Sequence, residues 1–142
     1  MIRKLPILVL VMLLTALLPG QKRATQQIQL PPASPNSGPQ MFRAYCADCH
    51  GVDGKGNGPV AAVLKIMPPD LTTLTQRNQG TFPYDRVFKT ISGDANIVPH
   101  GTREMPMWGP VFRQVGKGHP GEAQLRLKTL TNYLASLQAQ TK

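Results

Sequence analysis

The sequence predicts an all-α domain, and two features of its pattern support this fold class. Apolar residues recur every three or four positions in several segments, as they do along the buried face of a helix. No segment shows the strict alternation of apolar and polar residues that is typical of a half-buried strand. We therefore expect three to five helices and no sheet.

Two helices are predicted in the first half of the domain. The first covers residues 39–49 and begins at Pro39, which suits the first helical position because its missing N–H would have no partner there. The second is shorter and covers residues 60–66, where Val60, Val63 and Leu64 follow helical spacing.

Two further helices are predicted towards the C-terminus. One covers residues 84–91, and Gly93 is expected to end it. The other covers residues 122–138 and has Tyr133 beside its apolar stripe. That stripe consists of four leucines: Leu127, Leu130, Leu134 and Leu137.

The N-terminal region has the pattern of a targeting segment followed by a linker. Arg3 and Lys4 precede an apolar run over residues 7–18, about as long as the core of a signal peptide. The cleavage-site pattern is poor, so residues 1–20 are either a signal peptide or an N-terminal anchor. Residues 21–37 are rich in Gln, Pro, Ser and Asn, and we expect a disordered linker there. The folded domain is then expected over residues 38–142.

The chain is basic, with 16 Lys and Arg against 7 Asp and Glu, a formal charge of +9. Removal of Arg3 and Lys4 with residues 1–20 would leave 14 basic residues and a charge of +7. The basic residues form no tight run, which argues against a nucleic-acid-binding arm. A diffuse positive field favours an acidic partner surface or anionic lipid headgroups, although it also serves solubility alone.

The only two cysteines lie in the run Cys46-Ala47-Asp48-Cys49-His50, the pattern of a c-type haem attachment site. At this spacing on a helical turn, both thiols reach the vinyl groups of one porphyrin. The histidine that follows then presents its imidazole to the iron. A structural zinc site would need a second ligand pair, which is missing, and a simple disulfide or a thioredoxin-like pair would leave His50 unexplained.

Around this motif the chain resembles the class I cytochromes c. The run Gly38-x-x-x-Phe42-x-x-x-Cys46-x-x-Cys49-His50-Gly51 is similar to the opening of that family. The stretches at residues 53–59 and 68–72 are similar to its bacterial mono-haem branch, and the likeness covers about residues 38–137. The resemblance implies the cytochrome c fold, wrapped around one covalently bound haem c.

The resemblance also implies a methionine as the second axial ligand of the iron, in a loop before the last helix. Met105 is our choice, because Met105-Pro106-x-Trp108-Gly109 resembles the family pattern in which the liganding methionine precedes a proline, and Met107 is the alternative. His100 in the same region would give a bis-His haem instead. Met67 also precedes a proline, but it lies only 17 residues after His50.

Three more residues are candidates for contacts with the haem. In the family, the backbone carbonyl of a proline in the position of Pro59 accepts a hydrogen bond from the distal nitrogen of the haem histidine, which orients the ring. Trp108 and Arg103 flank the ligand loop, and both are candidates for contact with a haem propionate. The simpler alternative is a buried tryptophan in the pocket wall and an exposed arginine.

The last helix is predicted to cross the first. The pattern Leu130-x-x-Tyr133-Leu134 resembles the family's terminal helix, which packs near Gly38 and Phe42. A glycine permits close approach of two helices, and the two aromatic rings can meet edge to face.

The expected function is single-electron transfer outside the cytoplasm. An iron with two protein ligands has no open position, which argues for an electron-transfer protein rather than an enzyme. The role is that of a respiratory electron carrier or of the cytochrome c subunit of a membrane or periplasmic redox complex, with redox proteins as partners. The alternative is a haem-based small-molecule sensor or enzyme in which the weakly bound Met ligand is displaced.

Overall fold

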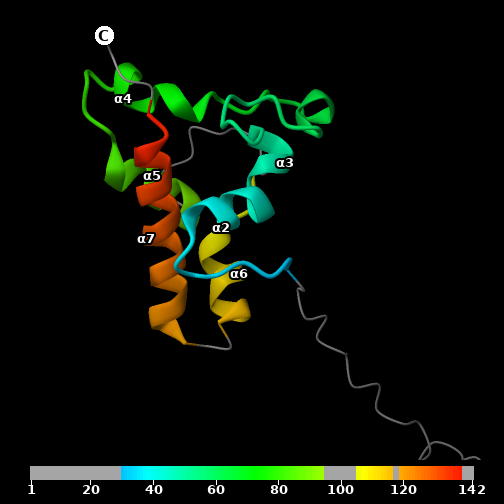
Figure 1. Ribbon diagram of the computed structural model, residues 1–142, viewed down its shortest axis with the longest axis vertical. Helices are drawn as coiled ribbons and strands as arrows, with labels where there is room; N and C mark the ends of the chain where they lie inside the picture. The colour runs from blue at the N-terminus through cyan, green and yellow to red at the C-terminus, as the bar shows by residue number, and fades with distance from the viewer. Residues whose placement is uncertain (1–29, 95–104, 117–118, 139–142) are drawn as a thin grey trace, which may run out of the picture.

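A computed structural model describes residues 30–94, 105–116 and 119–138 (Figure 1). These residues form six α-helices, more than the three to five predicted, and two short 3-10 helices. They contain no strand, so the all-α prediction is confirmed. The elements are α2 (Gly38–Tyr45), α3 (Ala47–His50), η2 (Ala61–Val63), η3 (Leu71–Thr73), α4 (Leu74–Arg77), α5 (Tyr84–Ser92), α6 (Trp108–Val115) and α7 (Pro120–Ser136).

The predicted helix over residues 39–49 is in fact two helices that meet at Cys46. α2 begins one residue before Pro39, where the Ser37 side chain caps it by accepting a hydrogen bond from the Gln40 N–H. Cys46 leaves the helical conformation (φ −121°, ψ −31°), and α3 then runs to His50. The chain therefore bends at the first haem-motif residue.

The predicted helix over residues 60–66 is wrong, because only a single 3-10 turn forms there. Val63 is 83% exposed, and of the η2 residues only Ala61 is buried. Leu64 is already extended (ψ 144°). The apolar spacing misleads here because Leu64 and Ile66 line a cavity instead of packing against another helix.

Two predicted helices are confirmed. α5 spans Tyr84–Ser92 and ends at Gly93 in the left-handed conformation (φ 80°), as expected for a C-terminal glycine. α7 spans Pro120–Ser136, and its stripe of Leu127, Leu130 and Leu134 is buried. α4 and α6 were not predicted.

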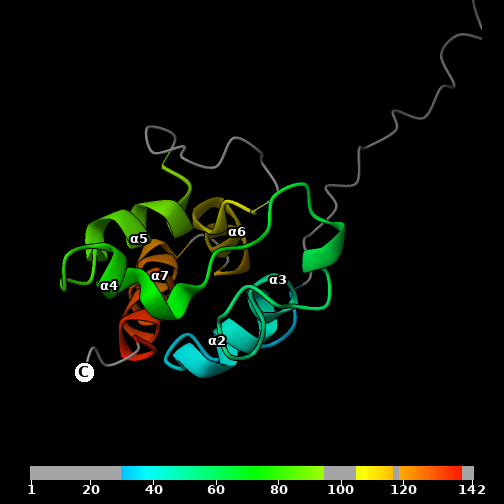
Figure 2. The ribbon, with the colours of Figure 1, turned by 90° about the horizontal axis from the view of Figure 1, so that it is seen from above.

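α7 organises the domain by packing against α2, α5 and α6 (Figures 1 and 2). At its crossing with α2, a Cβ added to Gly38 would lie 2.5 Å from the Cβ of Tyr133, so only glycine allows this approach. The rings of Phe42 and Tyr133 meet with centroids 5.5 Å apart and planes tilted by 56°. The predicted helix crossing is therefore confirmed.

The domain extends upstream of the expected boundary at Gly38. Leu30 and Ala33 pack against the hydrophobic core, and the Ala33 carbonyl accepts a hydrogen bond from Arg126 at 3.0 Å. Residues 30–37 therefore belong to the folded unit rather than to the linker predicted over 21–37. Apolar contacts and a buried arginine hold this segment, and neither is visible from its Pro-rich composition.

Residues 1–29, and with them the predicted signal peptide or anchor, lie outside the described residues. Among the residues that are described, no helix has the length and apolar character to cross a membrane.

Candidate functional site

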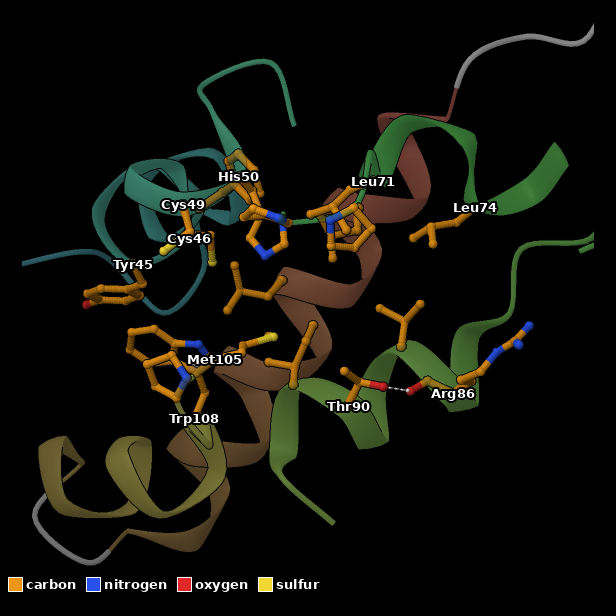
Figure 3. A pocket seen from close by; sticks show the side chains of 18 of the residues that line it. Tyr45, Cys46, Cys49, His50, Leu71, Leu74, Arg86, Thr90, Met105 and Trp108 are labelled. Atoms are coloured by element: carbon orange, nitrogen blue, oxygen red, sulfur yellow. Dashed lines mark hydrogen bonds between the residues drawn. The ribbon is translucent and has the colours of Figure 1, made fainter. Parts of the chain in front are cut away.

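One cavity of about 360 Å³ opens between the haem-motif segment and the helices that face it, and most of its lining side chains are apolar (Figure 3). Its volume lies at the lower end of the range typical of ligand and cofactor pockets. The cavity draws side chains from α2, α3, α4, α5 and α7, from the stretch between η2 and η3, and from the start of α6.

Cys46, Cys49 and His50 lie together on one side of this cavity. Figure 3 shows the His50 imidazole projecting into the cavity next to the two cysteines. The α3 turn produces this grouping, because the Cys46 carbonyl accepts hydrogen bonds from the N–H groups of Cys49 (3.2 Å) and His50 (2.9 Å). His50 is 9% exposed.

The two cysteines form no disulfide with each other. Burial, with a smaller contribution from the neighbouring Cys49, raises the pKa of Cys46 to about 12. Burial and the Asp48 carboxylate also raise the pKa of Cys49. A raised pKa makes a thiol less reactive, whereas the cysteines of thioredoxin-like pairs have lowered pKa values.

The glycine-rich turn after His50 folds back onto α3. The Gly58 N–H donates to the Cys49 carbonyl at 3.1 Å, and the Val60 N–H donates to the Asp48 carbonyl at 3.0 Å. A Cβ on Gly58 would collide with the Asp48 carbonyl oxygen, so this position needs glycine. Pro59 lies exposed between the two bonds, with its backbone held against the haem-motif turn.

The methionines of the predicted ligand loop lie in different surroundings. Met105 lines the cavity and packs against the core, and Figure 3 shows its side chain directed towards the cavity from the side opposite His50. Met107 is 57% exposed, does not line the cavity and lies against Gly93. Met67 lines the cavity on its outer rim and is 70% exposed.

Trp108 forms part of the cavity wall and is only 7% exposed. Its indole ring stacks on Phe112 at 5.5 Å and lies 5.4 Å from the ring of Tyr45. Arg103 and His100, the other candidates in this region, lie outside the described residues.

Two arginines that sequence reasoning missed line the same cavity. Arg77 at the end of α4 donates to the Asp70 carbonyl, and Arg86 on α5 donates to the Asn78 side chain at 2.5 Å. Figure 3 shows Arg86 on the far side of the cavity from Tyr45 and Trp108. The sequence carried no signal for this role, because these residues lie among the scattered basic positions.

Two thiols and an imidazole lie on one turn and face a thioether across an apolar cavity, and these are the donor types that hold the haem of c-type cytochromes. The fold and this site define the chain as a c-type cytochrome domain, whose function is haem-based electron transfer. Residues 33–116, more than half of the chain, match the family model described as cytochrome c oxidase, cbb3-type, subunit III, and the chain belongs to this family.

The family assignment supports the resemblance noted from the sequence and implies haem c binding. Cytochrome c domains of this type are typically extracytoplasmic. Searches of curated proteins and of solved structures returned no match.

Proposed function

We propose that Cys46 and Cys49 hold one haem c covalently, that His50 and Met105 ligate its iron, and that the domain transfers single electrons outside the cytoplasm. When bound, the haem supplies an iron that cycles between the ferrous and ferric states. The observation that carries the proposal is the placement of His50 and Met105 on opposite sides of the one cavity that both cysteines line (Figure 3).

The chain's own residues provide attachment, ligation and burial. Thioethers at Cys46 and Cys49 would hold the porphyrin against α3, and His50 and Met105 would ligate its iron, which would leave no open site for a substrate. A methionine ligand and an apolar cavity would each disfavour the more highly charged ferric state. Together they favour a relatively high reduction potential.

Polar residues around the cavity would orient the bound group. Hydrogen bonds from the N–H groups of Gly58 and Val60 to α3 hold Pro59 in place. This supports the proposed hydrogen bond between the Pro59 carbonyl and the His50 ring. Arg77 and Arg86 are suited to pair with haem propionates, since guanidinium groups bind carboxylates with two parallel donors. Trp108 serves as cavity wall.

An exposed apolar rim beside the cavity is the proposed contact for redox partners. Ile66 and Met67 line the cavity yet are 51% and 70% exposed, and Val63 nearby is 83% exposed. Lys55 and Lys65 are exposed in the same part of the chain. Apolar contact flanked by lysines suits a partner with an acidic surface, whose approach the positive field would accelerate.

In this proposal the domain is a respiratory electron carrier or the cytochrome c subunit of a membrane or periplasmic redox complex. Residues 1–20 act as a signal peptide or as an anchor that keeps the domain at the membrane surface. The domain would only transfer electrons, and its partner complex would carry out the catalysed reaction.

The ferric near-infrared spectrum tests the ligand assignment, because iron–methionine ligation gives a characteristic weak band. We expect Met105→Ala to abolish this band and Met107→Ala, the matched control in the same loop, to retain it. Loss of the band in Met107→Ala alone would refute the choice of Met105. Ready binding of carbon monoxide by the reduced wild-type protein at neutral pH would favour the sensor alternative.

A further inference from the structure

Arg126 on α7 is a buried cation outside the cavity and is 6% exposed. Its Nε and Nη2 atoms donate to the Glu122 carboxylate at 3.0 and 2.8 Å, and its Nη1 atom donates to the Ala33 carbonyl at 3.0 Å. The guanidinium also lies 5.8 Å from the centre of the Phe112 ring. One side chain therefore joins α7, the segment 30–37 and α6.

A second side chain, on α2, also holds the segment 30–37 by a hydrogen bond. The Tyr45 hydroxyl on α2 donates to the Pro31 carbonyl at 3.1 Å. We call the segment 30–37, together with Arg126 and Tyr45, the clasp. A buried arginine is costly unless it is paired and hydrogen-bonded, and here the Glu122 carboxylate and the Ala33 carbonyl supply that compensation.

The clasp is in direct contact with the cavity wall. The Tyr45 ring lies 5.4 Å from Trp108 and 5.6 Å from Phe112, and Phe112 is fully buried beneath Arg126. Tyr45 and Trp108 both line the cavity, and Figure 3 shows them on the same side as Met105. Trp108 follows Met105 by three residues and starts α6.

We propose that Arg126 is a positioning residue for the haem ligand, an inference that rests on the function proposed above. Met105 lies in a bend before α6 rather than in a helix, and both Met105 and Tyr45 pack against the core cluster that contains Trp108 and Phe112. In this proposal the approach of Met105 to the iron depends on the wall that these aromatic residues form. Arg126 holds that wall through Phe112 and through the segment that restrains Tyr45. Loosening the clasp makes it easier to displace Met105.

Imidazole, which competes with methionine for ferric iron, is the probe. The variants are Tyr45→Phe, which removes only the bond to Pro31, and the double change Glu122→Gln with Arg126→Met, which removes the buried pair without leaving an unpaired buried charge. Arg113→Met, an exposed arginine on α6, is the matched control. Unfolding by urea is measured alongside for each variant.

We expect imidazole to bind about twofold to fivefold more tightly to Tyr45→Phe, which loses one hydrogen bond, and about five- to tenfold more tightly to the double variant, which loses three. The control should bind as the wild type does. A structural role alone would lower resistance to urea and leave the imidazole affinity of the folded protein unchanged.

Unchanged imidazole affinity in both clasp variants would overturn the inference and leave the proposed function intact. If the double variant does not fold, Tyr45→Phe decides the question by the same criterion. Wild-type protein without haem, or without the near-infrared band, would instead refute the proposed function and the inference with it.

Discussion

At the crossing of α2 and α7, one methyl group added to Gly38 should destabilise the domain. In Gly38→Ala, the new Cβ would lie 2.5 Å from the Tyr133 Cβ and 3.1 Å from the Thr129 carbonyl oxygen, whereas ordinary contact begins at 3.4 Å. The nearest atoms belong to the backbone or to the stem of a side chain, so relief requires the two helices to move apart. Such overpacking costs about 1–3 kcal/mol, and the higher helix propensity of alanine returns at most about 1 kcal/mol.

The net expectation for Gly38→Ala is a loss of about 1–2 kcal/mol in the free energy of unfolding. For a domain of roughly 100 residues this corresponds to a melting temperature lower by about 5–10 °C. The assay is urea and thermal unfolding of the haem-loaded protein, followed by far-ultraviolet circular dichroism.

Gly121→Ala is the matched control, because nothing lies within 4 Å of its added Cβ at the start of α7. It should leave stability unchanged or raise it by about 0.5 kcal/mol. A Gly38→Ala protein as stable as the Gly121→Ala protein would refute the close helix contact.

Three further predictions follow from the packing and electrostatics of the domain. Gly58→Ala should weaken the turn against α3 by about 1–3 kcal/mol and lower the yield of haem-loaded protein, measured by absorbance per polypeptide. Phe112→Ala should cost about 3–5 kcal/mol in urea unfolding, since the ring is fully buried. A hydrogen bond from the Thr72 hydroxyl lowers the pKa of the Asp70 carboxyl in the folded protein. The Asp70 carboxylate therefore stabilises the fold at pH values above the pKa that this carboxyl has in the unfolded chain, and the stabilisation is lost as the pH falls through its pKa in the folded protein. Urea titrations should therefore show wild type more stable than Asp70→Asn at neutral pH, with the difference vanishing in acid; a constant difference would contradict this.

The elements that sequence reasoning predicted correctly are those in which local signals agree with tertiary packing. α5 has apolar residues at helical spacing and a glycine at its end, and Gly93 does adopt the left-handed conformation there. The leucines of α7 were placed on one buried face, and the approach of Gly38 to Tyr133 could be anticipated from two short motifs.

α6 escaped prediction because its first turn contains Gly109 and Pro110, residues that normally argue against a helix. Pro110 is the third residue of α6, where the N–H would have no partner within the helix. Gly109 is required because a Cβ there would lie 2.5 Å from the Ser92 carbonyl oxygen of α5. Both explanations depend on tertiary position, which the sequence does not show.

The false helix over residues 60–66 has a related cause. Its apolar residues do not face a helical neighbour, because Leu64 and Ile66 line the cavity and Val63 faces outward. A cofactor-sized cavity can be lined by irregular chain as well as by a helix, so apolar spacing alone does not separate the two. Arg77 and Arg86 were missed because the sequence does not show which scattered residues the fold brings to the cavity.

The haem-motif residues were the most predictable part of the site, because attachment chemistry dictates their spacing within five residues. The choice between Met105 and Met107 depended on resemblance, since both lie in one short loop. The two side chains differ mainly in burial, which the sequence could not specify.

The covalent state of the cysteines tests the central claim most directly. We would digest the mature protein, purified from cells that attach haem to c-type cytochromes, and measure the mass of the peptide that contains Cys46 and Cys49. The account predicts a single peptide carrying the mass of one haem through both sulfurs, absent from the Cys46→Ala/Cys49→Ala variant. A peptide with the unmodified mass, or with the mass of an internal disulfide, would contradict it.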